Sequence, residues 1–379
     1  MIFEREEYLR RVRLTEAAMA RAGLDALITY AVKNDPGSVI YLTGYETGLG
    51  LHDVAFFVAA PGGNPAYVLL TNAFWDNPAG LTWVDDVVIT SDFGSRLLEF
   101  LPESAKRIGI AGYKFFPTPV YTALHAARPN AHFEDATDLL MDVAKVKSSA
   151  EVAAIQRCVE MTDAGGRAFL LSVREGATER EIKVEVERAI MLAGSDGLWY
   201  NFQVYSGPQV AVGMGLMTGR TLAKGEQVQV DCGALYGGYR GDLSRVTTVG
   251  APSREVRAVM EATADMYDAM LAAARPGVLI GDLARAALAV AKSRGMEQFL
   301  YQSPNCPPGF LGHGMGCWTH SYPTIHADVK DPLEANMVLV FETILGQPGV
   351  GGAKIEDSIL ITPRGAERLS QLPIRTWPA

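Results

Sequence analysis

The chain has 379 residues, of which 48% are hydrophobic and 20% are charged, and its formal net charge is −9 at pH 7. This length predicts two or three domains, and the composition excludes long disordered stretches. The acidic balance, without any run of Lys or Arg, argues against nucleic-acid binding. The N-terminal segment lacks the apolar core of a signal peptide, and no apolar run is long enough to span a bilayer. We therefore expect a cytoplasmic protein that binds neither nucleic acid nor membrane.

The N-terminal third of the chain alternates helix and strand signals. A charged amphipathic stretch runs from about Glu4 to Ala22 and predicts a helix. Turn residues such as Pro61-Gly62-Gly63 separate the strand-like runs that follow. These runs are 25–31, 54–60, 66–70, 85–90 and 107–111. The alternation predicts a small α/β domain over residues 1–145.

The remaining residues, 146–379, combine long helices with strand pairs. Thr178, followed by Glu181 three residues later, is a capping box that starts a helix ending near Gly194. Another helix runs from about Ser253 to Ala274. The runs EQVQVDCG, GDLSRVTTV, MVLVFETIL and KIEDSILIT have the character of strands. An α+β domain follows from this mixture.

The segment QVQVDCGALYGGYRGDLSR reads as a hairpin that carries two aspartates, Asp231 and Asp242. With a two-residue turn at Tyr236-Gly237, these two residues face each other across the antiparallel pair. Facing Cβ atoms lie about 5 Å apart, so the two carboxylates repel unless one is protonated or a divalent cation joins them. The alternative is an ordinary pair of surface aspartates beside a turn.

Two histidines, His313 and His320, share the Gly-rich segment GFLGHGMGCWTHSYP. Glycines beside His313 allow the backbone to approach a ligand closely. Farther along, Glu342 ends the apolar run VLVFE, and Glu356 begins KIEDSILIT, with the connection GQPGVGG predicting a hairpin between them. A buried carboxylate needs a metal ion or a basic partner, and Lys354 is the candidate for the second solution.

The order of these residues resembles the pita-bread metallopeptidases, which include methionine aminopeptidases, Xaa-Pro aminopeptidases and Xaa-Pro dipeptidases. The matching segments are VDCGALYGGYRGDLSR, GHGMG, VFE and IEDSILIT. The segments VKSSAEVAAIQRC and YLTGY resemble the two-domain members, which include creatinase. The resemblance implies a pita-bread catalytic domain over residues 146–379, preceded by a smaller α/β creatinase-like domain over residues 1–145.

The resemblance also implies a two-metal hydrolytic centre. Asp231 would chelate one ion, Asp242 and Glu356 would bridge both, and His313 and Glu342 would complete the two shells. A hydroxide that bridges the ions would be the nucleophile. The carboxylate-rich set favours Mn²⁺, with Fe²⁺, Co²⁺ or Zn²⁺ as rivals.

Further roles follow from the same resemblance. Glu342 would carry the proton from the nucleophilic water to the leaving nitrogen, and His320 would contact the substrate and stabilise the developing charge. The chain would form a homodimer, in which the segment from Thr43 to His52 covers the partner's pocket, with His52 at the substrate. A plain surface loop is the alternative for this segment.

The chain departs from the family pattern around the substrate. Met214 stands where the family has a histidine that contacts substrate, and Gly309 stands where many Xaa-Pro enzymes have another. Lys354 replaces an arginine that often lies two residues before the last ligand. The metal ligands are thus kept while the substrate contacts are changed.

Three functions remain open on this basis. The first is a dinuclear-metal hydrolase that cleaves dipeptides or short peptides of the Xaa-Pro type. The second is an amidohydrolase of a small non-peptide or cyclic amide, similar to ectoine hydrolase, and the changed substrate contacts favour it. The third is a non-catalytic binding module on the same fold, although such relatives typically lose metal ligands. A metal-free hydrolase similar to creatinase is a further alternative that the intact ligand set disfavours.

Overall fold

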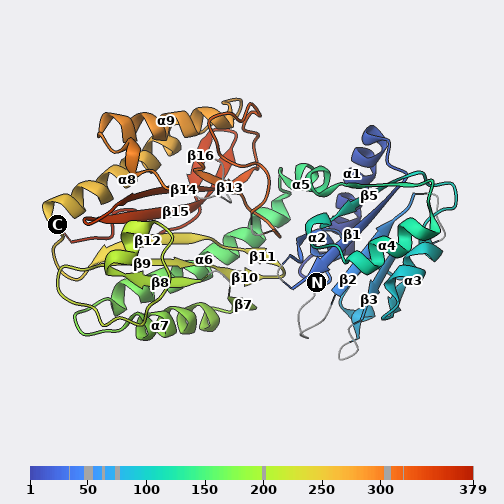
Figure 1. Ribbon diagram of the computed structural model, residues 1–379, viewed down its shortest axis with the longest axis horizontal. Helices are drawn as coiled ribbons and strands as arrows, with labels where there is room; N and C mark the ends of the chain where they lie inside the picture. Colours follow the sequence, from blue (N-terminus) through green and yellow to red (C-terminus); the bar gives the residue numbers. More distant parts are fainter. Residues whose placement is uncertain are drawn as a thin grey trace. The chain divides into compact units, whose positions relative to one another are not determined.

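The computed structural model describes residues 1–33, 35–46, 54–61, 65–72, 77–198, 202–302, 309–318 and 320–378 (Figure 1). The described chain forms two compact units. The first comprises Met1–Lys145 together with Gly316–Tyr322, and the second comprises Val146–Met315 together with Pro323–Ala379.

The first unit is built on a six-stranded sheet in the order β4-β3-β2-β1-β5-β6. Strand β1 pairs in parallel with β5 and antiparallel with β2, so the sheet is mixed. The strands are β1 (Ala26–Val32), β2 (Val54–Ala59), β3 (Tyr67–Thr71), β4 (Val87–Ile89), β5 (Arg107–Ala111) and β6 (His132–Asp135). The helices are α1 (Arg5–Ala22), α2 (Gly37–Thr43), α3 (Phe93–Phe100), α4 (Thr118–Ala127) and α5 (Thr137–Ala144). The α/β character expected from the sequence is confirmed.

The second unit contains four long helices and a seven-stranded sheet. The helices are α6 (Ser149–Ser172), α7 (Glu179–Leu192), α8 (Arg254–Ala273) and α9 (Ile280–Ser293). The capping box of Thr178 and Glu181 is present at the start of α7, as predicted. The sheet has the order β13-β14-β15-β12-β9-β8, and β16 pairs with β15. Its strands are β8 (Gln203–Ser206), β9 (Gln227–Cys232), β12 (Leu243–Thr248), β13 (Gly312–Gly314), β14 (Val338–Gln347), β15 (Gly351–Thr362) and β16 (Gly365–Arg368).

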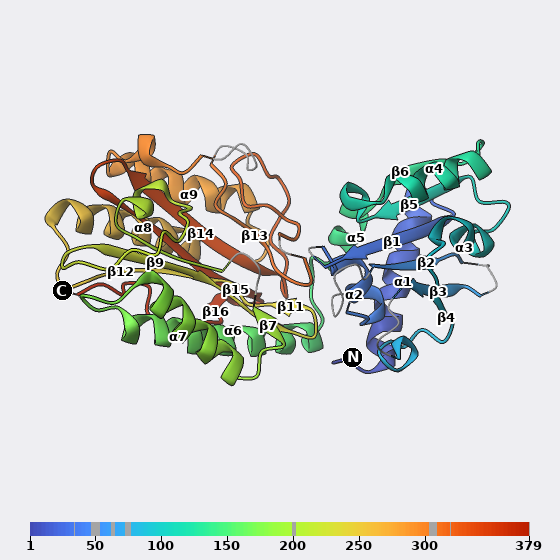
Figure 2. The ribbon, with the colours of Figure 1, turned by 60° about the horizontal axis from the view of Figure 1, so that its bottom comes forward.

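The helices cover one face of this sheet and leave the other face for polar side chains. Figure 1 and Figure 2 show α6 near β9, α7 near β8, and α8 near β14 and β15, with α9 packed beside α8. Val230 packs with residues of α6 and α7, whereas Phe341 and Ile355 pack with residues of α8 and α9. Because side chains alternate along a strand, Asp231, Glu342 and Glu356 point to the opposite face. The amphipathic pattern of these strands therefore places acidic residues together.

The hairpin that carries the two aspartates has a different register from the predicted one. The turn residues are Gly237 and Gly238 between β10 (Ala234–Tyr236) and β11 (Tyr239–Arg240), rather than Tyr236-Gly237. Both glycines have positive φ, 54° and 81°, which a two-residue turn of this hand requires and which Tyr adopts poorly. As a result Asp231 lies opposite Ser244, and Asp242 is two residues away from that position. A small three-stranded sheet adds β7 (Gly197–Leu198) to β10.

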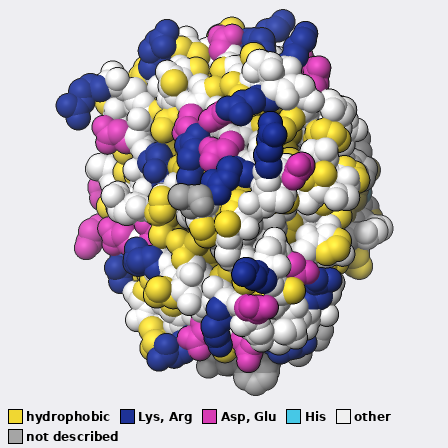
Figure 3. All heavy atoms as spheres, turned by 90° about the vertical axis from the view of Figure 1, so that its left-hand side faces the viewer, with side chains coloured by type: hydrophobic (Ala, Val, Ile, Leu, Met, Phe, Trp, Pro, Cys, Tyr) yellow, Lys and Arg dark blue, Asp and Glu magenta, His cyan; other side chains and the backbone are white. Residues whose placement is uncertain are grey.

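The C-terminal segment is fastened to α8 by exposed ion pairs. Figure 3 shows a face on which basic and acidic side chains are interspersed. Arg375 pairs with Glu261, Asp265 and Asp268, which recur at helical spacing along α8, at N···O distances of 2.7 to 2.9 Å. This network joins the last residues of the chain to the helical layer of the second unit.

Among the described residues, none of the helices combines the length and the hydrophobicity that crossing a bilayer requires.

Candidate metal centre

Four neighbouring strands bring the acidic residues into one row. Glu342 on β14 is paired directly with Glu356 on β15, and Ser244 on β12 is paired with both Glu356 and Asp231 on β9. Cross-strand partners have Cβ atoms about 5 Å apart, so the carboxylates at both ends of this row can reach a common centre. Both glutamates lie inside long strands, whereas the sequence suggested a strand end for Glu342 and a strand start for Glu356.

His313 enters the centre from the short strand β13. Gly312 precedes it with φ of 134°, and a Cβ there would lie 2.0 Å from the carbonyl oxygen of Val340, so only glycine fits. The Nδ1 atom of His313 lies 2.8 Å from the carbonyl oxygen of Gly314. Because a carbonyl can only accept, Nδ1 carries the proton and the neutral ring presents Nε2 as a ligand atom.

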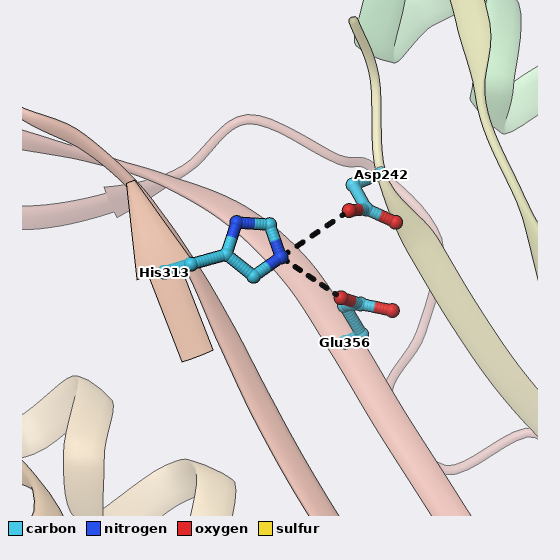
Figure 4. Close-up of side chains that lie close together, drawn as sticks. All are labelled: Asp242, His313 and Glu356. Carbon is cyan, nitrogen blue, oxygen red and sulfur yellow. Dashed lines mark ion pairs between the residues drawn. The ribbon is translucent and has the colours of Figure 1, made fainter. Parts of the chain in front are cut away.

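Asp242, His313 and Glu356 form a buried group with the donor set of a metal site. Figure 4 shows the imidazole pointing between the two carboxylates. The Nε2 atom of His313 lies 3.6 Å from Oδ2 of Asp242 and 3.9 Å from Oε1 of Glu356. One ligand atom from each of the three residues lies within 4.8 Å of the others. An ion that drew these atoms inward would satisfy all three.

Lys354 occupies the other side of the same acidic cluster. Its Nζ atom lies 2.7 Å from Oδ2 of Asp231, 3.1 Å from Oε1 of Glu342 and 3.0 Å from Oε2 of Glu356. All four side chains are buried. The sequence had suggested Lys354 as a basic partner in place of a metal, and the structure shows that it contacts three of the five expected ligands.

The charges in the cluster do not balance. Four carboxylates, those of Asp231, Asp242, Glu342 and Glu356, face one ammonium, so full ionisation leaves a charge of 1 − 4 = −3. Burial raises the pKa of Asp242 and of Glu356 well above the ordinary range, and although Lys354 opposes the shift, neighbouring carboxylates add to it. Burial also raises the pKa of Asp231, against the lowering effect of Lys354.

The residues fit the metal that the chemistry calls for. Oδ1 of Asp231 and Oδ1 of Asp242 are buried, and no described residue gives either of them a hydrogen bond. An unpaired buried carboxylate oxygen is costly, and a divalent cation removes that cost. Carboxylates with one imidazole form a set that Mn²⁺, Fe²⁺, Co²⁺ and Zn²⁺ all accept.

Two glutamines that the sequence analysis did not single out hold the centre in shape. The side-chain amide of Gln229 accepts from the backbone N–H of Lys354 at 3.0 Å and donates to its carbonyl at 2.9 Å. Gln227 makes the same pair of contacts with Gly352. Gln227, Gln229 and Asp231 alternate along β9, so their side chains lie on one face of the strand. This spacing in the sequence could have indicated that the two glutamines lie beside the centre.

The residues expected to contact the substrate lie in separate parts of the chain. Met214 is half-buried in the second unit, between Gly213 and Gly215, whose backbones pack against Ile344 and Tyr205 respectively. Gly309 is half-buried with φ of 77°, a conformation that a histidine adopts poorly. His320 is exposed and belongs to the segment Gly316–Tyr322 of the first unit. His52 lies outside the described residues.

Comparison with family models gives two matches. Residues 153–363 match metallopeptidase family M24, and residues 11–143 match the creatinase/prolidase N-terminal domain. The first match covers more than half of the chain and includes all the residues of the acidic cluster.

Individual relatives agree with these matches. The chain is 29% identical over 239 residues to an Xaa-Pro dipeptidase of Pyrococcus furiosus, an alignment that spans 63% of this chain and 67% of that relative. In fold it is similar to a prolidase from Thermococcus sibiricus, with a TM-score of 0.86, 23% identity, and 98% of each chain covered. An X-Pro aminopeptidase from Thermotoga maritima gives a TM-score of 0.82 at 23% identity, covering 96% of this chain and 98% of that one.

Proposed function

Because the chain belongs to metallopeptidase family M24 and is therefore a metal-dependent hydrolase, we propose that it cleaves the amide bond of Xaa-Pro dipeptides or short peptides. The observation that carries this proposal is the buried group of Asp242, His313 and Glu356 beside two further carboxylates. The curated relatives named Xaa-Pro dipeptidase support the choice of substrate class.

Two divalent ions would be held by five residues. Asp242 and Glu356 would be shared between the ions, His313 and Glu342 would complete their shells, and Asp231 would chelate one of them. Oxygen-rich ligation with one imidazole favours Mn²⁺, with Fe²⁺, Co²⁺ and Zn²⁺ as rivals. Bound ions supply a hydroxide nucleophile at neutral pH and polarise the scissile carbonyl.

The protein's own side chains would supply the remaining chemistry. Glu342 is buried at the edge of the cluster and would carry a proton from the attacking water to the leaving nitrogen. His320 would contact the substrate and stabilise charge on the carbonyl oxygen. His52 would reach the substrate from the neighbouring subunit of a homodimer, and the enzyme would act in the cytoplasm.

The test is hydrolysis of matched dipeptides by the Mn²⁺-loaded protein. Gly-Pro, Ala-Pro and Leu-Pro are compared with Gly-Ala, Ala-Ala and Leu-Ala, so that only the residue after the scissile bond changes. Turnover of the Pro series with little turnover of the Ala series is the expected result. Equal turnover of both series would contradict the Xaa-Pro specificity, and no turnover of either would contradict the peptidase assignment.

A second candidate function is hydrolysis of a small cyclic or non-peptide amide. The apolar side chain of Met214 and the absent side chain of Gly309 favour it, because neither offers a hydrogen bond to a peptide substrate. A panel of cyclic amides and cyclic amidines, assayed under the same metal conditions, separates the two candidates. Turnover in this panel without turnover of any dipeptide would establish the second function.

A further inference from the structure

The ammonium group of Lys354 lies where a cation would be expected in the acidic cluster. A lysine ammonium has three N–H donors and no acceptor. Asp231, Glu342 and Glu356 each place one carboxylate oxygen 2.7 to 3.1 Å from its nitrogen, and of these three ion pairs the one with Asp231 is also a hydrogen bond. The lysine side chain is only 3% exposed, so water does not compete for these contacts.

The two oxygens of Glu356 face different groups, the imidazole of His313 and the ammonium of Lys354. Oε1 lies toward Nε2 of His313, on the side of the centre that Asp242 completes. Oε2 lies toward Nζ of Lys354. A carboxylate shared between two ions would divide its oxygens in the same manner. Lys354 therefore imitates one ion of a pair, while the group of Asp242, His313 and Glu356 retains room for the other.

The backbone beneath Lys354 is fixed. The amide of Gln229 is hydrogen-bonded to both the N–H and the carbonyl of Lys354, and Gln227 does the same for Gly352. These contacts tie β15 to β9 across the sheet. An ion that takes the oxygens now facing Nζ must therefore displace the ammonium by a change in the lysine side chain alone.

We propose that Lys354 is a tethered cation that competes with the second metal ion. One divalent ion binds first to Asp242, His313 and Glu356 with Lys354 in place. The second ion binds only as the ammonium withdraws from Asp231, Glu342 and Glu356, and its affinity is reduced by the cost of that displacement. The inference rests on the proposed function only in that two ions share this centre.

The test is a titration of the metal-free full-length protein with Mn²⁺ alone, followed by calorimetry and by native mass spectrometry to count bound ions. The wild-type protein should bind the second ion at least about tenfold more weakly than the first. Lys354→Met, which keeps the length of the side chain but removes the charge, should strengthen binding of the second ion at least about tenfold. Lys292→Met, which removes an exposed lysine of α9, should leave both affinities unchanged.

Several results would overturn the inference. Equal affinities for two ions in the wild-type protein would contradict it, as would a second-ion affinity in Lys354→Met no tighter than in the wild type. If Lys354→Met does not fold, Lys354→Gln provides the same loss of charge with an amide that still donates to carboxylates. No substrate enters the titration, so failure to cleave any peptide would refute the proposed function and leave this inference intact.

Discussion

Strand β15 carries two buried ionic clusters on opposite faces of the sheet, and the number of basic groups available to each carboxylate differs between them. Glu356 points to the open face of the sheet, and its neighbour Asp357 points to the face that the helices cover. Asp357 accepts two hydrogen bonds from Arg245, at 3.0 and 2.9 Å, and pairs with Arg368 at 3.0 Å. Among the described residues, Glu356 pairs with one ammonium, that of Lys354, which also pairs with Asp231 and Glu342.

The difference separates a structural role from a functional one. Two guanidinium groups, those of Arg245 and Arg368, contact the one carboxylate of Asp357. Arg245 also donates to the carbonyl of Pro373, so this cluster fastens the C-terminal tail to the sheet. Around Glu356 the acidic groups exceed the basic ones. A buried carboxylate that is fully paired with basic groups needs no ligand, whereas an excess of carboxylates requires protons or cations.

The largest expected effect is on activity, through Glu356→Gln. The amide keeps the shape of the side chain but loses the charge and one of the two ligating oxygens. We expect kcat/KM toward the best substrate to fall by at least about a thousandfold, equivalent to about 4 kcal/mol. The control Glu367→Gln changes an exposed glutamate on β16 and should retain full activity. An active Glu356→Gln protein would remove Glu356 from the centre.

In the cluster around Asp357, Arg245→Met should lower the free energy of unfolding by about 3–5 kcal/mol, because it leaves Asp357 with a weaker set of partners in a buried position. Urea unfolding of the metal-free protein measures this change. The folded fraction should still bind Mn²⁺. A loss smaller than about 1 kcal/mol would mean that Arg368 alone satisfies Asp357.

For the unbalanced cluster, Lys354→Met should destabilise the metal-free protein by about 2 kcal/mol, less than Arg245→Met, because the abandoned carboxylates can take up protons. Saturating Mn²⁺ should recover most of that loss. Thermal unfolding with chelator and with Mn²⁺ provides the comparison. A destabilisation that Mn²⁺ leaves unchanged would indicate that Lys354 has a purely structural role, as Arg245 does.

The same cluster predicts a pH dependence. Burial and neighbouring carboxylates, against the opposing charge of Lys354, raise the folded-state pKa of Asp242 and Glu356 well above the unfolded values near 4. The metal-free native chain therefore binds more protons than the unfolded chain above that pH, and its stability falls as pH rises. We expect a slope of about −1 kcal/mol per pH unit between pH 5 and 7.

Unfolding in chelator at a series of pH values measures this slope. Asp242→Asn removes one of the titrating groups and should make the slope shallower. Mn²⁺ binds the deprotonated ligands, so the loaded protein should lose the negative slope. A metal-free protein whose stability rises from pH 5 to 7 would contradict the charge imbalance.

The smallest expected effect concerns the exposed network of Arg375. Although it pairs with three carboxylates of α8, solvent screens these contacts, and Arg375→Ala should cost no more than about 1 kcal/mol. Urea unfolding in low and high salt checks this, since any loss should shrink in salt. A loss as large as that of Arg245→Met would show that exposure does not distinguish these clusters.

Local patterns predicted much of the fold. The capping box of Thr178 and Glu181, the alternation in QVQVD and the hairpin between β14 and β15 all appear in the structure. The prediction of the hairpin register was wrong because the turn residues are Gly237-Gly238 and not Tyr236-Gly237. This change shifts the pairing of the two strands by two residues. Positive φ at both central positions favours the two glycines.

The centre was only partly predictable. The acidic residues and His313 could be chosen from the sequence because carboxylates inside apolar strands need a partner. Which of them share a partner depends on pairing between β9, β12, β14 and β15, and no local pattern determines this. The hydrogen bonds between the Gln229 side chain and the Lys354 backbone connect residues 125 positions apart. The position of the Lys354 ammonium therefore could not be predicted from the spacing of residues in the sequence.

The most direct test of the account is the metal dependence of the wild-type enzyme. Metal is removed with a strong chelator, the residual content is measured, and hydrolysis of Gly-Pro, Ala-Pro and Leu-Pro is followed as Mn²⁺ is returned. We expect activity to disappear with the metal and to return as the ions are restored. Unchanged activity in the metal-free protein would contradict the assignment of Asp231, Asp242, His313, Glu342 and Glu356 as a hydrolytic metal centre.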